Sequence, residues 1–189
     1  MSVTEKWNTR YASAPRGEAA WVLREYAHLL PARGQALDLA CGLGANALFL
    51  AERGLAVSAW DVSSVAIERL QAEATTRKLS VNASVRDVLN VPPLPASFDV
   101  IVVAHFLERE LFPALLTALR PGGVLFYQTF TSERVTDVST PSNPEFLLAP
   151  NELRELCQPL RLLVYREDSL CGDLTQGRRA LAALVGMKV

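Results

Sequence analysis

The stretch Leu37-Asp38-Leu39-Ala40-Cys41-Gly42-Leu43-Gly44-Ala45-Asn46 is the strongest indication of how this chain folds. An apolar run over residues 36–40 leads directly into two glycines and then into a segment of helical period. Gly42 and Gly44 have no Cβ and adopt positive φ easily, so they let a ligand approach the backbone. In an open α/β sheet the ligand crevice lies beyond the carboxyl ends of the strands, where this turn falls. The stretch therefore predicts a strand, a ligand-binding turn and a helix.

The rest of the chain repeats this alternation of short apolar runs and segments of helical period, which is typical of a parallel sheet covered by helices. We expect helices at residues 46–53, 64–77, 110–119 and 151–157, and a hairpin loop at 167–179. A turn at Pro121-Gly122-Gly123 should separate the third helix from the fifth strand. The seven expected strands cover residues 36–40, 56–60, 82–86, 100–104, 124–129, 160–166 and 180–185.

Length and composition limit the classes of protein that fit. The 189 residues suit a single domain spanning 1–189, and half of them are hydrophobic, as in a globular protein. With 19 basic and 20 acidic side chains the net charge is −1, so we expect no nucleic acid partner. Three cysteines without C-x-x-C spacing argue against disulfides and a zinc site. The absence of a signal segment and of an apolar stretch of roughly 20 residues predicts a cytoplasmic protein outside the membrane, as a monomer or homodimer.

Acidic residues beside the glycines indicate the charge of the ligand. Taken alone, Gly42-x-Gly44-x-x-Ala47 also satisfies the dinucleotide fingerprint, so an NAD-binding Rossmann oxidoreductase is an alternative. However, Asp38 lies in the strand before the turn, and Asp61 and Asp87 follow the second and third strands. Three carboxylates at one crevice suit S-adenosylmethionine (SAM), which carries a sulfonium and an ammonium group, whereas they would repel the pyrophosphate of NAD.

Several motifs together resemble the class I SAM-dependent methyltransferases. They are Asp38-x-Ala40-x-Gly42-x-Gly44, the acid Asp61, Arg86-Asp87-Val88 and Leu119-Arg120-Pro121-Gly122-Gly123. The pattern departs from the family at Ala40, where many members have a glycine. The resemblance implies an α/β fold with a Rossmann-like sheet of seven strands in the order 3-2-1-4-5-7-6, with strand 7 antiparallel and helices on both faces.

The same resemblance implies which residues bind SAM. Asp61 would bind the ribose hydroxyls and Asp87 the adenine amine, while Val62 and Val88 would flank the adenine ring. His105 would lie next to the reactive methyl group, as a general base or, alternatively, as a packed or capping histidine. The cofactor-binding residues that the resemblance implies are Asp38, Ala40, Cys41, Gly42, Gly44, Asn46, Asp61, Val62, Asp87, Val88, Ala104, Arg10 and Tyr11.

Within that family, Trp7-Asn8-x-Arg10-Tyr11, Ala45-Asn46-Ala47 and residues 50–54 are similar to the tellurite-resistance and thiopurine branch. This similarity implies a small-molecule acceptor such as a thiol or a chalcogen oxyanion, and a helical lid within residues 1–30 that folds over SAM. The other interpretation is an amphipathic first helix that packs on the sheet, and the two are compatible. The loop 131–150 is long for a connection, so we expect it to select the acceptor. A SAM-binding module without catalytic activity is a further alternative.

Overall fold

A computed structural model of the chain describes residues 2–135 and 138–189. Within them, seven strands form one sheet in the order β3-β2-β1-β4-β5-β7-β6. The strands from β1 to β5 pair in parallel, whereas β7 runs antiparallel to both β5 and β6. The fold class, the strand order and the direction of strand 7 expected from the sequence are thereby confirmed. The strands are β1 (Gln35–Leu39), β2 (Ala56–Asp61), β3 (Val81–Val85), β4 (Phe98–Ala104), β5 (Leu119–Phe130), β6 (Arg161–Glu167) and β7 (Leu181–Met187).

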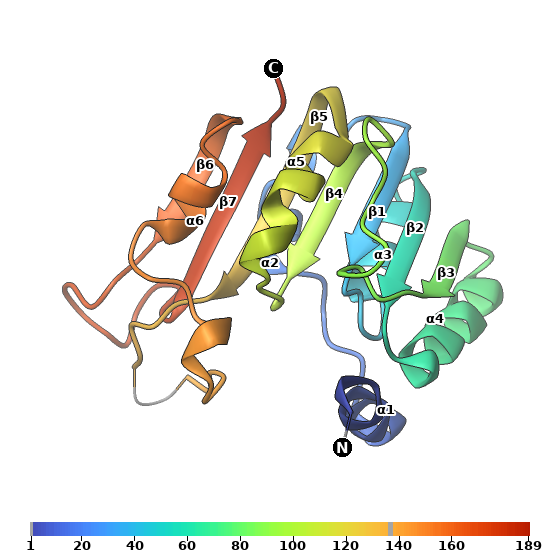
Figure 1. The fold of residues 1–189 in the computed structure, drawn as a ribbon, viewed down its shortest axis with the longest axis horizontal. Helices are drawn as coiled ribbons and strands as arrows, with labels where there is room; N and C mark the ends of the chain where they lie inside the picture. Colours follow the sequence, from blue (N-terminus) through green and yellow to red (C-terminus); the bar gives the residue numbers. More distant parts are fainter. Residues whose placement is uncertain (1, 136–137) are drawn as a thin grey trace.

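Helices cover both faces of the sheet. In Figure 1, α5 and α6 lie on the near face, and α2 and α3 lie behind the sheet. Among the described residues, no helix combines the length and the apolar character that a membrane crossing requires. The α-helices are α1 (Val3–Ser13), α2 (Trp21–Glu25), α3 (Ala45–Ala51), α4 (Ser64–Arg77), α5 (Phe112–Ala118) and α6 (Glu152–Leu156), and the short 3₁₀ turns are η1 (Ala27–Leu29), η2 (Arg109–Leu111) and η3 (Pro144–Phe146).

The strand residues divide between two cores because successive side chains of a strand point to opposite faces of the sheet. In β4, Val100 and Val102 pack with residues of α2, α3 and α4, while Ile101 and Val103 pack with residues of α5 and α6. All four side chains are fully buried. A strand that is covered on both faces has an uninterrupted apolar sequence, which is why the central strands were located well from the sequence.

β5 differs from the sequence prediction at its start. The strand begins at Leu119 instead of residue 124, and the expected turn Pro121-Gly122-Gly123 lies inside it as a bulge. Gly122 adopts a φ of 78°, and its N–H donates to the Lys188 carbonyl at 2.8 Å. The looped-out residues therefore stay hydrogen-bonded to the end of the sheet. α5 is shorter than the expected helix and ends at Ala118.

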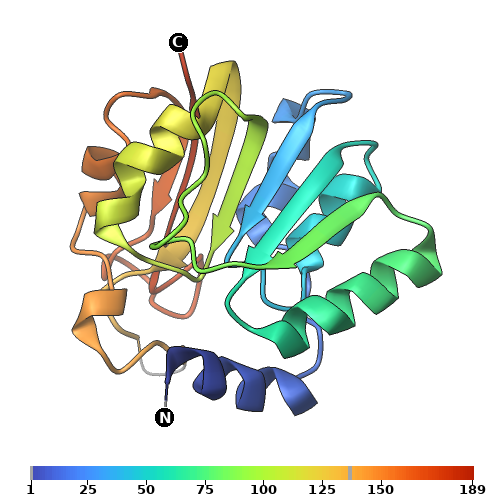
Figure 2. The same cartoon turned by 45° about the vertical axis from the view of Figure 1, so that its right-hand side comes forward.

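α1 lies on neither face of the sheet. Figure 2 shows this helix, in dark blue, across the end of the sheet at which β1, β2 and β4 terminate. None of its residues belongs to the core, and side chains at the start of α4 position it instead. The Ser63 hydroxyl donates to Asn8 Oδ1 at 2.6 Å, and the Arg69 guanidinium donates to the carbonyls of Tyr11 and Ala14. The alternative in which the first helix packs on the sheet is therefore wrong.

Gly44 ends the glycine turn in a left-handed conformation, with a φ of 77° and a ψ of 30°, and α3 begins at the next residue. A Cβ at this position would lie 2.3 Å from Cδ1 of Leu70, a fully buried residue of α4. The backbone of the turn and the side chain of Leu70 are thus in close contact, and a glycine is required between them.

We expect Gly44→Ala to destabilise the protein more than Gly122→Ala. Both glycines have nearly the same positive φ, so both variants carry the cost of about 1–2 kcal/mol for an L-residue there. The new methyl group collides with Leu70 at position 44, whereas no described residue lies within 4 Å of a Cβ at position 122. Urea denaturation of the wild type and both variants measures the difference. Equal losses of stability would contradict the close packing of Gly44.

Candidate functional site

A cavity of about 520 Å³ opens at the carboxyl ends of β1, β2 and β4, next to α1. Its walls are the glycine turn, the first residues after β2, β3 and β4, and one side of α1. With the exception of Asp38, every site residue expected from the sequence lines this cavity. Those lining residues are Arg10, Tyr11, Ala40, Cys41, Gly42, Gly44, Asn46, Asp61, Val62, Asp87, Val88, Ala104 and His105.

Asp38 lies behind the glycine turn and is completely buried. Its two carboxylate oxygens accept separate hydrogen bonds, from Asn46 Nδ2 at 3.3 Å and from the backbone N–H of Ala47 at 2.9 Å. Burial raises the pKa of this carboxyl group to about 7, although the two hydrogen bonds act in the opposite direction. Asp38 therefore connects the end of β1 to the start of α3 from outside the cavity.

Asp61, the last residue of β2, joins the turn to the start of α4. Its carboxylate accepts from the N–H of Gly42 at 2.8 Å and from the N–H of Ser63 at 2.9 Å. Ser63 is the N-cap of α4, because its hydroxyl accepts from the N–H of Ala66. Burial raises the pKa of Asp61. Each carboxylate oxygen keeps a further lone pair for a donor in the cavity.

The residues after β3 form a turn on the cavity wall. Asp87 is exposed and accepts from the N–H of Leu89 at 3.0 Å, whereas Val88 is buried. Arg86 stacks over Trp60 of β2, with its guanidinium carbon 3.8 Å from the ring centroid. Asp87 thus makes a turn of the kind common for an aspartate before a proline-rich loop, and it also faces the cavity.

α1 brings an aromatic pair and a cation to the cavity. The rings of Trp7 and Tyr11 stack with their centroids 5.3 Å apart, and the Arg10 guanidinium lies over the Trp7 ring. The Tyr11 hydroxyl is so close to the turn that a Cβ on Gly42 would lie 2.7 Å from it. Burial and the nearby Asp61 raise the pKa of the Tyr11 phenol, so it remains a neutral donor.

Two cavity residues that follow strands have a left-handed backbone. Ala40 follows β1 with a φ of 53°, and His105 follows β4 with a φ of 56°. A left-handed backbone is unfavourable for residues with a Cβ. This explains why many members of the family that the motifs resemble have a glycine at the position of Ala40. Backbone strain of this kind often occurs at functional sites, and both Ala40 and His105 line this cavity, while five other non-glycine residues with positive φ lie elsewhere in the described chain.

His105 is held by its neighbours in β5. Its ring stacks on Phe130, with centroids 5.0 Å apart and an angle of 28° between the planes. Nε2 of His105 lies 3.2 Å from Nε2 of Gln128, and Oε1 of the same glutamine accepts from the N–H of Val22 at 3.2 Å. Desolvation lowers the pKa of His105, so the ring is neutral at physiological pH.

Sequence reasoning missed Arg16 and Gln128. Arg16 donates to the carbonyl of Leu43 in the glycine turn at 2.8 Å and forms a salt bridge with Glu73 of α4 at 3.2 Å. Gln128 is a buried polar residue within the apolar run of β5. A polar side chain in such a run must find buried partners, and this was the signal that could have identified it. No local pattern singles out Arg16.

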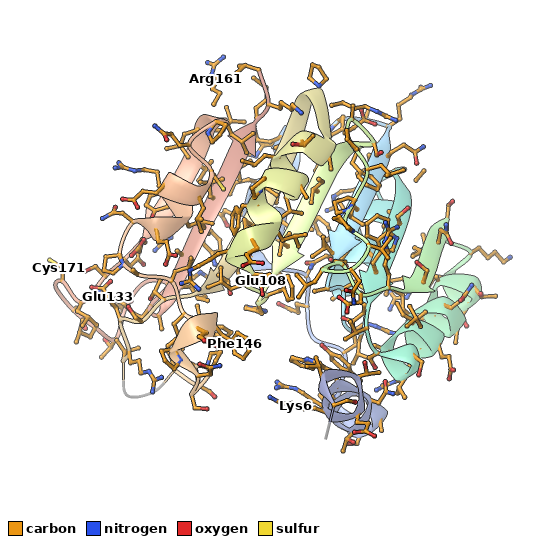
Figure 3. All side chains as sticks on the ribbon, viewed as in Figure 1. Lys6, Glu108, Glu133, Phe146, Arg161 and Cys171 are labelled. Atoms are coloured by element: carbon orange, nitrogen blue, oxygen red, sulfur yellow. The ribbon has the colours of Figure 1, made fainter. Side chains whose placement is uncertain are left out.

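The loop 131–150 contributes no lining residue to the cavity over its described parts, 131–135 and 138–150. Arg109, which follows β4, holds part of this loop by donating to the carbonyl of Leu147 at 3.0 Å. In Figure 3, Phe146 of the loop lies at the same end of the molecule as Lys6 of α1. The role of the loop in selecting the acceptor stays a prediction.

A second cavity, of about 420 Å³, lies between α6 and the strands β6 and β7. Its lining includes one thiol, Cys157, and burial raises the pKa of that thiol to about 12, so it stays protonated and unreactive. Arg161, at the start of β6, lies at the end of the molecule opposite α1 in Figure 3. The glycine turn, the acids Asp61 and Asp87 and the ring of His105 all line the first cavity, which we take as the functional site.

Comparison with known proteins finds related sequences. A family model described as "Methyltransferase domain" matches residues 36–123. The "Probable S-adenosyl-L-methionine-dependent methyltransferase TehB" of Haemophilus influenzae is 31% identical over 140 residues, which are 70% of this chain and 48% of that protein. By these two matches the chain is similar to the SAM-dependent methyltransferases, the family that its motifs resemble. That relative is named for its dependence on SAM, the cofactor expected for this chain from its sequence.

Two further comparisons describe how far the likeness between this chain and its relatives extends. The ubiquinone biosynthesis O-methyltransferase of Idiomarina loihiensis is 33% identical over 100 residues, which are 49% of this chain and 41% of that protein. The crystal structure of TehB from Haemophilus influenzae superposes with a TM-score of 0.72 at 24% identity, covering 98% of this chain and 67% of that one. The sequence match to TehB agrees with the expected branch, and the structural match shows that the two proteins share the fold. The chain spans about half the length of the curated relatives it matches.

The stability of the wild type and of Asp38→Asn should depend differently on pH. The pKa of Asp38 in the folded protein, about 7, is above its ordinary value of 3.8, so the folded state binds this proton more tightly than the unfolded state. The stability that this carboxyl group contributes is greatest below about pH 4 and is lost as the pH rises to about 7. The expected loss is on the order of 1 kcal/mol per pH unit within that window.

Urea denaturation at about pH 5, 6 and 7 measures this effect. As the pH rises, the wild type should lose stability relative to Asp38→Asn, which has no carboxyl group to ionise at this position. In the variant, the NH₂ group of the new asparagine faces one of the two donors, Asn46 Nδ2 or the N–H of Ala47, at every pH. This destabilisation does not depend on pH, so it does not affect how the stability difference changes with pH. Parallel pH curves for the two proteins would show that Asp38 does not titrate as stated.

Proposed function

We propose that this protein transfers the methyl group of SAM to a small-molecule acceptor, and that the acceptor is a thiol or a chalcogen oxyanion. The observation that carries the proposal is the pairing of Asp61 with the N–H of Gly42 and of Asp38 with the N–H of Ala47. Backbone N–H groups at such a turn and helix start are those that bind phosphate in dinucleotide-binding proteins. Because carboxylates occupy them here, the cavity favours a cationic ligand.

The same pairing argues against the NAD-binding alternative. A pyrophosphate at the turn would have to displace the Asp61 carboxylate from Gly42, and it would then lie beside a buried acid. Two neighbouring negative charges in a poorly solvated site repel each other strongly. The geometry therefore supports SAM over a dinucleotide.

The lining residues fit the parts of SAM. We assign the ribose hydroxyls to the free lone pairs of Asp61, the adenine ring to the apolar surfaces of Val62 and Val88, and its amine to Asp87. The methionine part faces the backbone of the turn at Gly42. The cavity volume of about 520 Å³ lies within the range of roughly 300–1,000 Å³ for small-molecule sites. Bound there, SAM would supply an activated methyl group on a sulfonium.

The chain contributes alignment and exclusion of water more than acid–base chemistry. Displacement at a sulfonium is accelerated when the two reactants are held in line. α1 covers the turn on the side of Tyr11, and the strained backbone of His105 places that ring at the cavity wall. A thiol or a chalcogen oxyanion reacts readily without a strong base, which suits a site whose histidine is neutral.

The remaining expectations about this protein stay predictions. They are a single domain over residues 1–189 with its lid in residues 1–30, a cytoplasmic location, a monomer or homodimer, and no nucleic acid partner. The cover that α1 forms over the turn supports a small acceptor, because a large one would have to displace this helix.

Isothermal titration calorimetry tests the cofactor. We expect SAM and S-adenosylhomocysteine to bind and NADH not to bind. Asp61→Asn should weaken SAM binding by about tenfold to hundredfold, because it removes a charged acceptor. Asp99→Asn is the matched control: its carboxylate also accepts a backbone N–H, that of Gln35, but it is not part of the cavity lining, so SAM affinity should not change. Binding of NADH without binding of SAM would overturn the proposal.

Mass spectrometry of reaction mixtures tests the acceptor class. The panel should contain small thiols, selenite or tellurite, and alcohols and amines of similar size. We expect methyl transfer to the first two groups and little to the others. Tight SAM binding without transfer to any member of the panel would favour the non-catalytic module instead.

A further inference from the structure

The surroundings of Gln128 determine how His105 carries its proton. Gln128 is 3% exposed, and Oε1 of its amide accepts from the backbone N–H of Val22 at 3.2 Å. A backbone N–H is always a donor, so the oxygen of the amide, and not its NH₂ group, must face Val22. The NH₂ group therefore faces Nε2 of His105, at 3.2 Å.

An NH₂ group has hydrogens to donate and no lone pair to offer, so Nε2 of His105 must be the acceptor. A neutral imidazole carries one proton, and here that proton is on Nδ1. A second proton on Nε2 would place two N–H groups against each other. The contact with Gln128 thus selects one tautomer of His105 and disfavours the cation.

Nδ1 is the ring nitrogen that remains for a molecule in the cavity. Stacking on Phe130 sets the plane of the His105 ring, and the backbone N–H of His105 donates to the Gln128 carbonyl at 2.8 Å. The ring forms no other hydrogen bond with the described residues, and it is exposed on the cavity wall. Both the position and the protonation of this donor are therefore set before any ligand binds.

We propose that Gln128 is a positioning residue that holds His105 as the neutral Nδ1–H tautomer, and that His105 binds the methyl acceptor as a hydrogen-bond donor instead of deprotonating it. The second half of this inference rests on the proposed methyltransferase function. It narrows the acceptor to molecules whose nucleophilic atom is deprotonated before binding, such as thiolates and oxyanions.

An acceptor of this class needs no base during the reaction. Its lone pair forms the bond to the methyl carbon while the carbon–sulfur bond breaks and leaves its electron pair on sulfur. The negative charge of the acceptor and the positive charge of the sulfonium disappear together, and no proton moves. Because the acceptor loses charge on the way to the transition state, the hydrogen bond from His105 is strongest before transfer. Its contribution should therefore appear in KM for the acceptor rather than in kcat.

Histidine-ring ¹H–¹⁵N NMR of the protein without cofactor or acceptor tests the tautomer directly. The chain has two histidines, so the exposed His28 serves as an internal reference in the same spectrum. At about pH 7.5 we expect the His105 ring to carry its proton on Nδ1 and a bare Nε2. A proton on Nε2 overturns the inference, whatever activity the protein has.

Gln128→Glu reverses the polarity of the contact at nearly constant shape. One oxygen of the new carboxylate still accepts from Val22, and the other accepts from His105, so a proton should appear on Nε2. Gln71→Glu, the same change at an exposed residue of α4, should leave the His105 signals unchanged. Identical His105 signals in the wild type and Gln128→Glu would show that Gln128 does not set the tautomer.

Acceptor kinetics separate hydrogen-bond donation from proton abstraction. The amide of asparagine reaches the place of Nδ1 and tolerates the positive φ at His105, whereas the amide of glutamine reaches the place of Nε2. With SAM affinity checked in both variants, His105→Gln should have a KM for a small thiol about tenfold above that of His105→Asn. Loss confined to kcat in both variants would overturn the donor role. An inactive wild type would count against the proposed function and leave the NMR result standing.

Discussion

The carboxylate of Asp38 is completely buried, and each of its oxygens accepts a hydrogen bond, one from Asn46 and one from the N–H of Ala47 in α3. A buried carboxylate that loses its partners is costly, so the start of α3 cannot move away from the end of β1 without a large loss of stability. The glycine turn between them is held in place at both ends, and Gly44 is pressed against Leu70. The positions of the other cavity walls depend on this turn.

The start of α2 extends the same network to the other side of the site. The N–H groups of Ala20 and Val22 donate to the amide oxygens of Asn46 and Gln128. Because each amide oxygen is engaged, each NH₂ group points onward, to Asp38 in one case and to His105 in the other. One short helix therefore orients two buried amides, and these orient the acid behind the turn and the histidine at the cavity wall.

These hydrogen bonds also explain how a Rossmann-like sheet comes to favour a cationic ligand. A glycine turn admits many ligands, and the discrimination lies in which groups already occupy its N–H donors. Asp61 occupies that of Gly42, and burial raises the pKa of both Asp38 and Asp61. A positive charge brought into the cavity would stabilise the ionised form of these carboxylates, whereas a phosphate would do the opposite.

The sequence by itself determined the α/β fold class and the glycine turn, because a sheet buried on both faces has apolar strands and because parallel strands place their carboxyl ends at one edge. The strand order and the expected cofactor-binding residues came from the resemblance of its motifs to a known family, and all of those residues except Asp38 line the cavity. The helix α4 could be predicted to its boundaries, since Ser63 supplies a local cap. Tertiary structure alone decided the bulge in β5, the place of α1 and the role of Gln128. These features depend on partners far away in the chain: Asn8 meets Ser63 across 55 residues, and Val22 meets Gln128 across 106. No local pattern encodes such a pairing, because its energy exists only after the sheet has brought the two segments together.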